Sequence, residues 1–191
     1  MEPNLLVGDR IIVKKFSYGI SKYSFPLSPP MFKGRILEWQ KPQRGDIVVF
    51  ETDRVYVKRL IGLPGDTIQM LEGKLYLNGK EVPQSPIKPL TSLRYIESLP
   101  NGVNYIVLDT ILNSYYDNTI LYRVPEGHYF FMGDNRDNSS DSRSQSSIGF
   151  VPYENILGKV ETVFFSSPEV RWYHPAFLFS LDKDRFFKSL N

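Results

Sequence analysis

The hydrophobic positions of this chain fall in short segments, most of them bounded by glycine, proline or aspartate. The clearest segment runs from 55 to 63 and ends in a Pro-Gly-Asp turn at 64–66, which is typical of a strand entering a tight loop. Successive side chains of a strand point to opposite sides, so Tyr56, Lys58 and Leu60 share one face. If the strand is buried, the ammonium group of Lys58 loses part of its hydration.

Similar patterns predict further strands before and after this one. They cover residues 5–15, 44–50, 74–80, 104–108, 122–132, 149–152 and 156–165. The segment 74–80 contains an Asn-Gly pair, the usual signal of a tight hairpin. Three strands with Gly-Asp turns near the beginning of the chain favour a β-rich core over alternating strands and helices.

The tail is the one place where a helix is expected. Residues 176–190 interleave phenylalanines with lysines and arginines, a pattern of amphipathic helices at membrane surfaces. The alternative is a C-terminal segment that packs on the β core.

Composition excludes several classes of function. The net charge is +2, and acidic and basic residues are interspersed, so nothing indicates a nucleic-acid partner. The chain has no cysteine, which excludes disulfides, thiol catalysis and cysteine metal sites. It has neither a run of about 18 apolar residues nor the pattern of a signal peptide at its start.

The polar loop 133–143 is rich in aspartate but does not have calcium-loop spacing. Counted from Asp134, the third position is Arg136, and the sixth is Ser139, where glycine is required. We expect internal ion pairs in this loop and no metal site. A serine–histidine–aspartate triad is also disfavoured, because neither His128 nor His174 accompanies a nucleophile-elbow motif.

A hydroxyl nucleophile with a lysine base remains as the possible catalytic chemistry. An ordinary lysine has a pKa of about 10.4, and burial can lower it by up to about 3–5 units, enough to supply a neutral amine. Lys58 is the candidate base, and Ser139 and Ser142 are candidate orienting or nucleophilic hydroxyls. The alternative is that Lys58 extends its amine to solvent from a strand end.

Four motifs in order, spanning positions 1 to about 152, resemble those of bacterial type I signal peptidases. They are Met1-Glu2-Pro3-x-Leu5-x-x-Gly8-Asp9-x-x-x-Val13-x-Lys15, Arg44-Gly45-Asp46-Ile47-Val48-Val49-Phe50, Tyr56-Val57-Lys58-Arg59-x-x-Gly62-Leu63-Pro64-Gly65-Asp66 and Gly133-Asp134-Asn135-Arg136-x-x-Ser139-x-Asp141-Ser142-Arg143. The resemblance implies an all-β fold of mainly antiparallel coiled sheets. It also implies a catalytic core at 1–66 and 124–175, a β insertion at 67–123 and a C-terminal segment at 176–191.

The resemblance implies a role for each matching residue. Lys58 corresponds to the general base, and Ser139 to the hydroxyl that holds its amine. The same supporting loop contains Ser142 and an ion pair between Asp141 and Arg143. Asp134, in this loop too, pairs with Arg59. The resemblance also places Ile11, Val49 and Val57 in shallow pockets for small substrate residues. This agrees with the narrow apolar pockets that β-branched side chains make.

The sequence departs from the family's pattern at two places. The family's nucleophilic serine immediately precedes the residue that is Met1 here, so the nucleophile, an oxyanion donor and a membrane anchor are expected upstream of this chain. The chain by itself is therefore expected to fold but not to cleave. The loop from 144 to 148 is also longer than usual, which should only alter the rim of the site.

The implied function is removal of signal peptides from exported preproteins after small residues, in the A-x-A pattern. The implied location is the bacterial inner membrane, with the catalytic part on the periplasmic face and in contact with the membrane surface. No cofactor is expected. Two alternatives stay open: a self-cleaving repressor-type Ser–Lys peptidase, and a non-catalytic β module that binds peptides.

Overall fold

The computed structural model describes residues 1–25, 34–88, 93–167 and 181–190, and within them the chain is almost entirely β. A seven-stranded sheet has the order β1-β15-β4-β5-β13-β14, with β16 also on β15. Its strands are Asp9–Lys14 (β1), Ile156–Ser166 (β15), Ile47–Glu51 (β4), Val55–Gly62 (β5), His128–Met132 (β13), Val151–Pro152 (β14) and Lys188–Ser189 (β16). The prediction of an all-β protein with antiparallel sheets is confirmed, because every named strand pair in the described residues is antiparallel.

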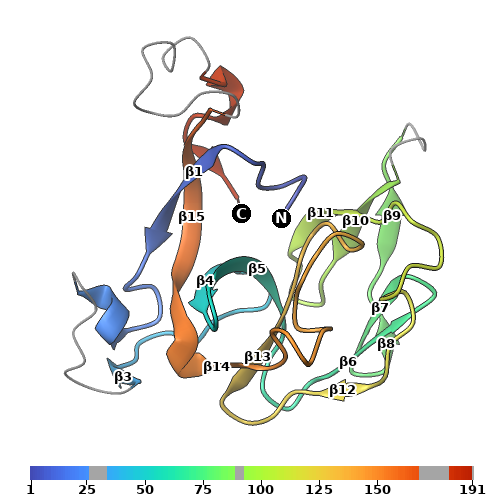
Figure 1. The fold of residues 1–191 in the computed structure, drawn as a ribbon, viewed down its shortest axis with the longest axis horizontal. Coiled ribbons are helices and arrows are strands. Elements are labelled where there is room, and N and C mark those ends of the chain that lie inside the picture. The colour runs from blue at the N-terminus through green and yellow to red at the C-terminus, as the bar shows by residue number, and fades with distance from the viewer. Residues whose placement is uncertain (26–33, 89–92, 168–180, 191) are drawn as a thin grey trace.

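Three smaller sheets complete the described structure. One has the order β12-β6-β7-β8, the second β11-β10-β9, and the third pairs β2 with β3. Their strands are Tyr122–Arg123 (β12), Thr67–Leu71 (β6), Lys74–Leu77 (β7), Lys80–Glu81 (β8), Asn104–Leu108 (β11), Arg94–Ser98 (β10), Gln84–Pro86 (β9), Ile20–Ser21 (β2) and Arg35–Leu37 (β3). In Figure 1 the long strands β1 and β15 lie on one side, the sheets β6–β12 on the other, and β4, β5 and β13 between them.

Strand β5 lies at the centre of the molecule because its apolar side chains serve two cores. Tyr56 and Leu60 pack with Phe50 and Phe131 in one buried cluster. Ile61 belongs to a second cluster, which extends into the sheets built from 67–123. A third cluster lies between β1, β4 and β15. The strand is thereby fixed between β4 and β13, and this fixes the backbone that carries Lys58.

The N-terminal residues lie between the two sides of the molecule (Figure 1). The Asn4 side chain donates to the Ile106 carbonyl oxygen on β11 at 2.7 Å. On the other side, Arg185 forms an ion pair with Asp9 and donates to the Asn4 carbonyl oxygen at 3.1 Å. Residues 1–8 are therefore held against both halves of the fold.

Two predicted elements differ from the structure. The expected strand 122–132 is two strands, β12 and β13, because a Pro-Glu-Gly turn interrupts it at 125–127. The helix expected over 176–190 lies partly outside the described residues. Within 181–190 the structure has only a short 3-10 helix, Lys183–Arg185 (η5), followed by β16. The end of this segment pairs with β15 as a strand instead of continuing as a helix.

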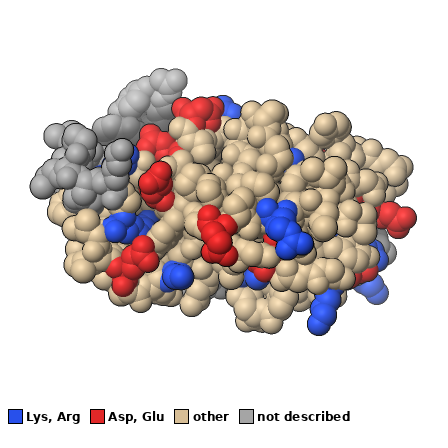
Figure 2. All heavy atoms as spheres, turned by 90° about the horizontal axis from the view of Figure 1, so that it is seen from below, with Lys and Arg blue, Asp and Glu red and all other residues tan. Residues whose placement is uncertain are grey.

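Charged side chains of both signs are scattered among uncharged ones on the face shown in Figure 2. This distribution agrees with the small net charge of +2. Two further 3-10 helices are present: Lys22–Ser24 (η1) lies between β2 and β3, and Tyr153–Asn155 (η3) lies between β14 and β15. Among the described residues, no helix combines the length and apolar character needed to cross a membrane.

Candidate active site

Lys58 projects from the centre of β5 and is half-buried. Its Nζ lies 2.9 Å from the Oγ of Ser139, 81 residues further along the chain. Burial lowers the pKa of Lys58; the nearby carboxylate of Asp141 acts in the opposite direction, and the guanidinium of Arg143 adds to the lowering. The site therefore favours an amine that loses its proton more easily than an exposed lysine does.

The loop that carries Ser139 leaves β13 through a glycine, and the site requires that glycine. A Cβ at Gly133 would lie 2.0 Å from the Oγ and 2.5 Å from the Cβ of Ser139. It would also lie 3.5 Å from the Nζ of Lys58. A side chain at 133 would therefore displace Ser139 from the lysine.

A buried ion pair between Asp141 and Arg143 braces the same loop. The Asp141 carboxylate accepts from Nε and Nη2 of Arg143, each at 2.9 Å, and from the backbone N–H of Gly133 at 3.0 Å. Burial opposes ionisation of Asp141, but Arg143 and these hydrogen bonds hold its pKa below the usual value. The pair closes the loop onto the end of β13.

Ser142 does not contact Lys58. Its Oγ accepts from the backbone N–H of Phe131 at 3.0 Å, and its own N–H donates to the Phe131 carbonyl oxygen at 3.0 Å. Its side chain is fully buried. Of the two serines considered as partners of Lys58, the structure brings only Ser139 to the amine, while Ser142 fastens the loop to β13.

Arg59, the neighbour of Lys58 on the opposite face of β5, binds Asp134 through two parallel hydrogen bonds of 2.8 Å each. Its third donor reaches the Gly45 carbonyl oxygen at 2.8 Å. Asp134 also accepts from the Asn4 side chain at 2.7 Å. This bidentate pair joins β5, the loop 133–143 and the N-terminal residues at one point.

The N-terminal residues bring Met1 to the lysine. The Met1 carbonyl oxygen accepts from the N–H groups of Asn4 and Leu5, both at 3.0 Å. Burial, and next the positive charge of Lys58, lower the pKa of the Met1 α-amino group. The backbone position at the start of this chain is therefore within electrostatic reach of Lys58.

A shallow groove of about 390 Å³ lies beside Met1. Its walls include Ile11 and Val57, two of the three residues expected to contact a substrate. The third, Val49, is buried with 6% of its surface exposed and belongs to the core cluster under the groove. The remaining walls come from residues 1–9 and from Asn135 and Asn138.

The sequence does not indicate the partner of Arg136. It predicted ion pairs within the loop 133–143, but Arg136 pairs with Glu97 on β10, and both side chains are buried. The only local signal was an acidic residue inside an otherwise unremarkable strand pattern. Nothing in the spacing of the two residues indicated their contact.

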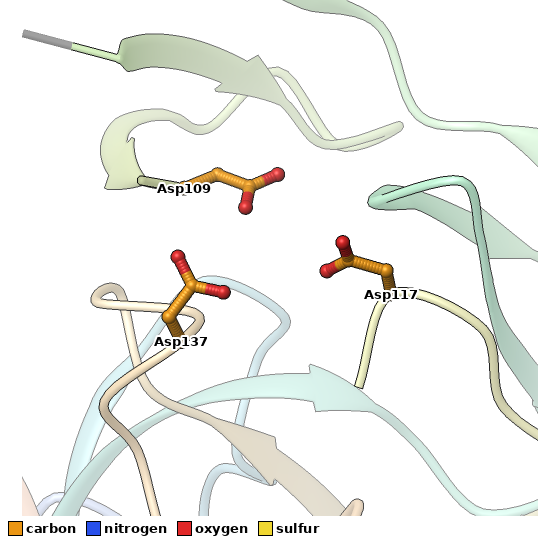
Figure 3. A group of neighbouring side chains, drawn as sticks. All are labelled: Asp109, Asp117 and Asp137. Atoms are coloured by element: carbon orange, nitrogen blue, oxygen red, sulfur yellow. The ribbon is translucent and has the colours of Figure 1, made fainter. Parts of the chain in front are cut away.

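A second arrangement that sequence analysis missed is a group of three carboxylates, Asp109, Asp117 and Asp137 (Figure 3). One oxygen of each lies within 4.8 Å of the others, close enough to hold a metal ion. Asp137 already accepts from the N–H groups of Thr110 and Ile111. Burial, and then the charges of its two carboxylate neighbours, raise the pKa of Asp109 to about 6. Proton uptake by Asp109 relieves the repulsion in the group.

Comparison with known proteins identifies the family. The sequence model described as "Signal peptidase, peptidase S26" matches residues 1–165. The chain belongs to the signal peptidase S26 family. This family consists of serine peptidases, and its bacterial signal peptidase I members are membrane-associated.

Curated relatives agree with this membership. Signal peptidase I of Rickettsia akari is 42% identical over 191 aligned residues, which cover 91% of this chain and 70% of the relative. Signal peptidase I of Rickettsia typhi is 41% identical, with coverage of 91% and 71%. A crystal structure of a signal peptidase I from Enterococcus faecalis aligns with 32% identity over 63% of this chain and 97% of that one, at a TM-score of 0.41. Family membership rests on the sequence matches.

Proposed function

We propose that this chain is the catalytic part of a signal peptidase I that uses a serine–lysine dyad. Lys58 is the general base, and the nucleophilic serine occupies the position immediately before Met1. The observation that supports this most strongly is the half-buried Lys58 amine, held by Ser139 within electrostatic reach of the Met1 α-amino group. A hydroxyl one residue upstream of Met1 would therefore be a neighbour of the amine.

The proposed reaction is acyl transfer in two steps. The neutral Lys58 amine takes the proton of the serine hydroxyl as the oxygen attacks the peptide carbonyl. Lys58 then gives this proton to the leaving amine, which breaks the peptide bond and leaves an ester on the serine. Lys58 then takes a proton from a water molecule, whose oxygen attacks the ester carbonyl. The bond between the acyl carbon and the serine oxygen breaks, and Lys58 returns the proton to that oxygen, which frees the peptide acid and restores the serine hydroxyl.

Ser139 acts in this scheme by orienting the base. An N–H of the amine donates to the Ser139 Oγ, which leaves the nitrogen lone pair free to face the upstream serine. The buried Asp141–Arg143 and Arg59–Asp134 pairs hold the two sides of this contact. Positioning of this kind contributes much of an enzyme's rate acceleration, because a general base must lie within hydrogen-bond reach of the proton that it removes.

The proposed substrates are signal peptides of exported preproteins, cut after small residues. Ile11 and Val57 in the groove wall are β-branched, and both pack against the buried cluster that contains Val49. Such walls accept alanine and exclude larger side chains by overlap. The proposed site of action is the periplasmic face of the bacterial inner membrane.

The test places a short leader in front of Met1, ending in serine in one protein and in alanine in the other. Cleavage of a preprotein with an A-x-A site is expected only with the serine leader, and Lys58→Ala should abolish it. Residues 1–191 alone should fold without cleaving. Turnover by the alanine-leader protein would contradict the assigned nucleophile, and no turnover by the serine-leader protein would favour a non-catalytic peptide-binding module.

We also propose that the C-terminal residues contact the membrane surface. Phe186 and Phe187 are 41% and 65% exposed, and Lys183 and Lys188 lie beside them in the sequence. Changing both phenylalanines to serine should weaken binding to phosphatidylglycerol-containing vesicles, while Leu112→Ser, at a residue of the segment 67–123 that is 87% exposed, should not. Equal binding by all three proteins would refute the contact. Deleting the whole tail is a poorer test, because Arg185 pairs with Asp9.

A further inference from the structure

A buried ion pair connects the loop of Ser139 to the sheet β9-β10-β11. Arg136 lies in this loop between Asp134 and Ser139, and the residue is 2% exposed. Its Nη1 donates to the Oε1 of Glu97 at 2.8 Å, and its Nη2 donates to Oε2. Glu97 is on β10, and its side chain is fully buried. The pair joins two segments that are 39 residues apart.

Glu97 is held by the strands on both sides of β10. Gln84 on β9 donates to Oε1 at 2.9 Å, and the hydroxyl of Tyr105 on β11 donates to Oε2. Burial opposes ionisation of Glu97, but Arg136 and these hydrogen bonds keep its pKa below the usual value. Both oxygens of the Glu97 carboxylate therefore accept hydrogen bonds. The three-stranded sheet β11-β10-β9 fixes the position of this negative charge.

The same sheet also meets the neighbour of Lys58. The ring of Tyr105 lies under the Arg59 guanidinium, with 4.1 Å between the guanidinium carbon and the ring centre. Arg59 in turn binds Asp134 at the start of the loop. Tyr105 therefore contacts both ion pairs, Glu97–Arg136 and Arg59–Asp134.

Backbone hydrogen bonds reinforce this connection. The N–H of Leu108, at the end of β11, donates to the Asp134 carbonyl oxygen at 2.8 Å, and the N–H of Arg136 donates to the Leu108 carbonyl oxygen at 2.8 Å. The Arg136 carbonyl oxygen accepts from Nη2 of Arg143 at 2.6 Å. Arg136 is therefore tied to the sheet by its side chain and N–H, and to the Asp141–Arg143 brace by its carbonyl.

We propose that Glu97 is a positioning residue of the peptidase, which acts through Arg136 to hold Ser139 against Lys58. The segment 67–123 thereby has a part in catalysis as a scaffold for the loop, although Glu97 touches neither substrate nor base. This inference rests on the proposed function of Lys58 and Ser139. Removing the Glu97 charge would leave the Arg136 charge buried and unpaired, so the loop would move to hydrate it.

Glu97→Gln tests the proposal in the serine-leader protein, with Glu81→Gln as the matched control. Glu81 lies in the same segment but forms an exposed ion pair with Lys74. With Glu97→Gln, kcat should fall about 10²-fold while KM changes little, because positioning rather than substrate binding is lost. Glu97→Asp, which keeps the charge, should recover part of kcat.

A second measurement separates positioning from general loss of structure. The pKa of Lys58 can be followed, without substrate, by the rate at which a reagent acylates its amine across pH. In Glu97→Gln this pKa should rise toward the ordinary lysine value, because the displaced loop admits water to the amine. An unchanged Lys58 pKa and kcat in folded Glu97→Gln would overturn the proposal. If that variant does not fold, Glu97→Asp decides: it keeps the charge but shortens the side chain that reaches Arg136, and an unchanged Lys58 pKa and kcat in it would again overturn the proposal.

The two proposals fail in different ways. Cleavage that survives Lys58→Ala would refute the proposed function, whatever the Glu97 variants do. A Lys58 pKa that is insensitive to Glu97 would refute only the positioning role, because this pKa is measured on the protein without substrate.

Discussion

At the scale of single residues, Lys58 depends on one hydrogen bond to Ser139. Ser139→Ala in the serine-leader protein should lower kcat by about 10²-fold with little change in KM, because the amine loses its fixed direction. Steady-state kinetics on a preprotein substrate measure the effect. Ser140→Ala is the control, since Ser140 is exposed and its Oγ bonds only Ser147 among the described contacts. Equal kcat values for Ser139→Ala and Ser140→Ala would show that Ser139 does not orient the Lys58 amine.

Asp109 allows a second prediction at this scale. Its pKa of about 6 in the folded protein is above the value near 3.9 expected when unfolded. A raised carboxyl pKa contributes stability that is present below about pH 4 and is lost as the pH rises through 6. Asp109→Asn should therefore raise the melting temperature at pH 7.5 and leave it unchanged at pH 4. A lower melting temperature at pH 7.5 would show that the three carboxylates do not repel one another.

At the scale of elements, the loop 133–143 owes its shape to a buried ion pair. Asp141→Asn should lower the free energy of unfolding by about 3–5 kcal/mol, because it leaves Arg143 buried without its counter-charge. Urea denaturation measures the change. Asp53→Asn is the control, because its contact with Arg54 is largely exposed to water, and it should unfold like the parent protein. Equal midpoints for both variants would mean that the pair does not brace the loop.

The elements also show what the sequence could predict. Strand β5 could be predicted because β-branched residues lead into a Pro-Gly-Asp turn. The strand predicted over residues 104–108 has the bounds of β11. The turn at 125–127 was overlooked because apolar residues continue on both sides of it. The Glu97–Arg136 contact could not be predicted, since it depends on how two sheets meet and not on any local pattern.

At the scale of the whole molecule, the arrangement of sheets decides where the chemistry can occur. The order β1-β15-β4-β5-β13 carries Lys58 on a central strand, where the N-terminal residues and the loop 133–143 meet it. The four motifs predicted, through the family resemblance, that these residues lie together around Lys58. Hydrophobic periodicity alone predicted only a β-rich core. The tail illustrates the same limit: its amphipathic pattern favours a helix, but in residues 181–190 pairing with β15 takes precedence.

Packing of the N-terminal residues gives a prediction at this scale. Arg185→Ala should loosen residues 1–9, because Arg185 pairs with Asp9 and donates to the Asn4 carbonyl oxygen. Faster amide hydrogen exchange at residues 4–9, with unchanged exchange in β6 and β7, is the expected result. Lys183→Ala serves as the control within the same turn. Unchanged exchange at residues 4–9 would show that the tail does not hold the N-terminal residues.

The most direct test of the account is the pKa of the Lys58 amine, measured by nuclear magnetic resonance of lysine labelled at Nζ over pH 6–11. The Lys58→Ala protein assigns the signal by its disappearance. The account predicts a pKa below the ordinary value of about 10.4, because the amine is partly removed from water. A Lys58 pKa at or above 10.4 would contradict it, since the amine would then be charged at neutral pH and unable to act as the base.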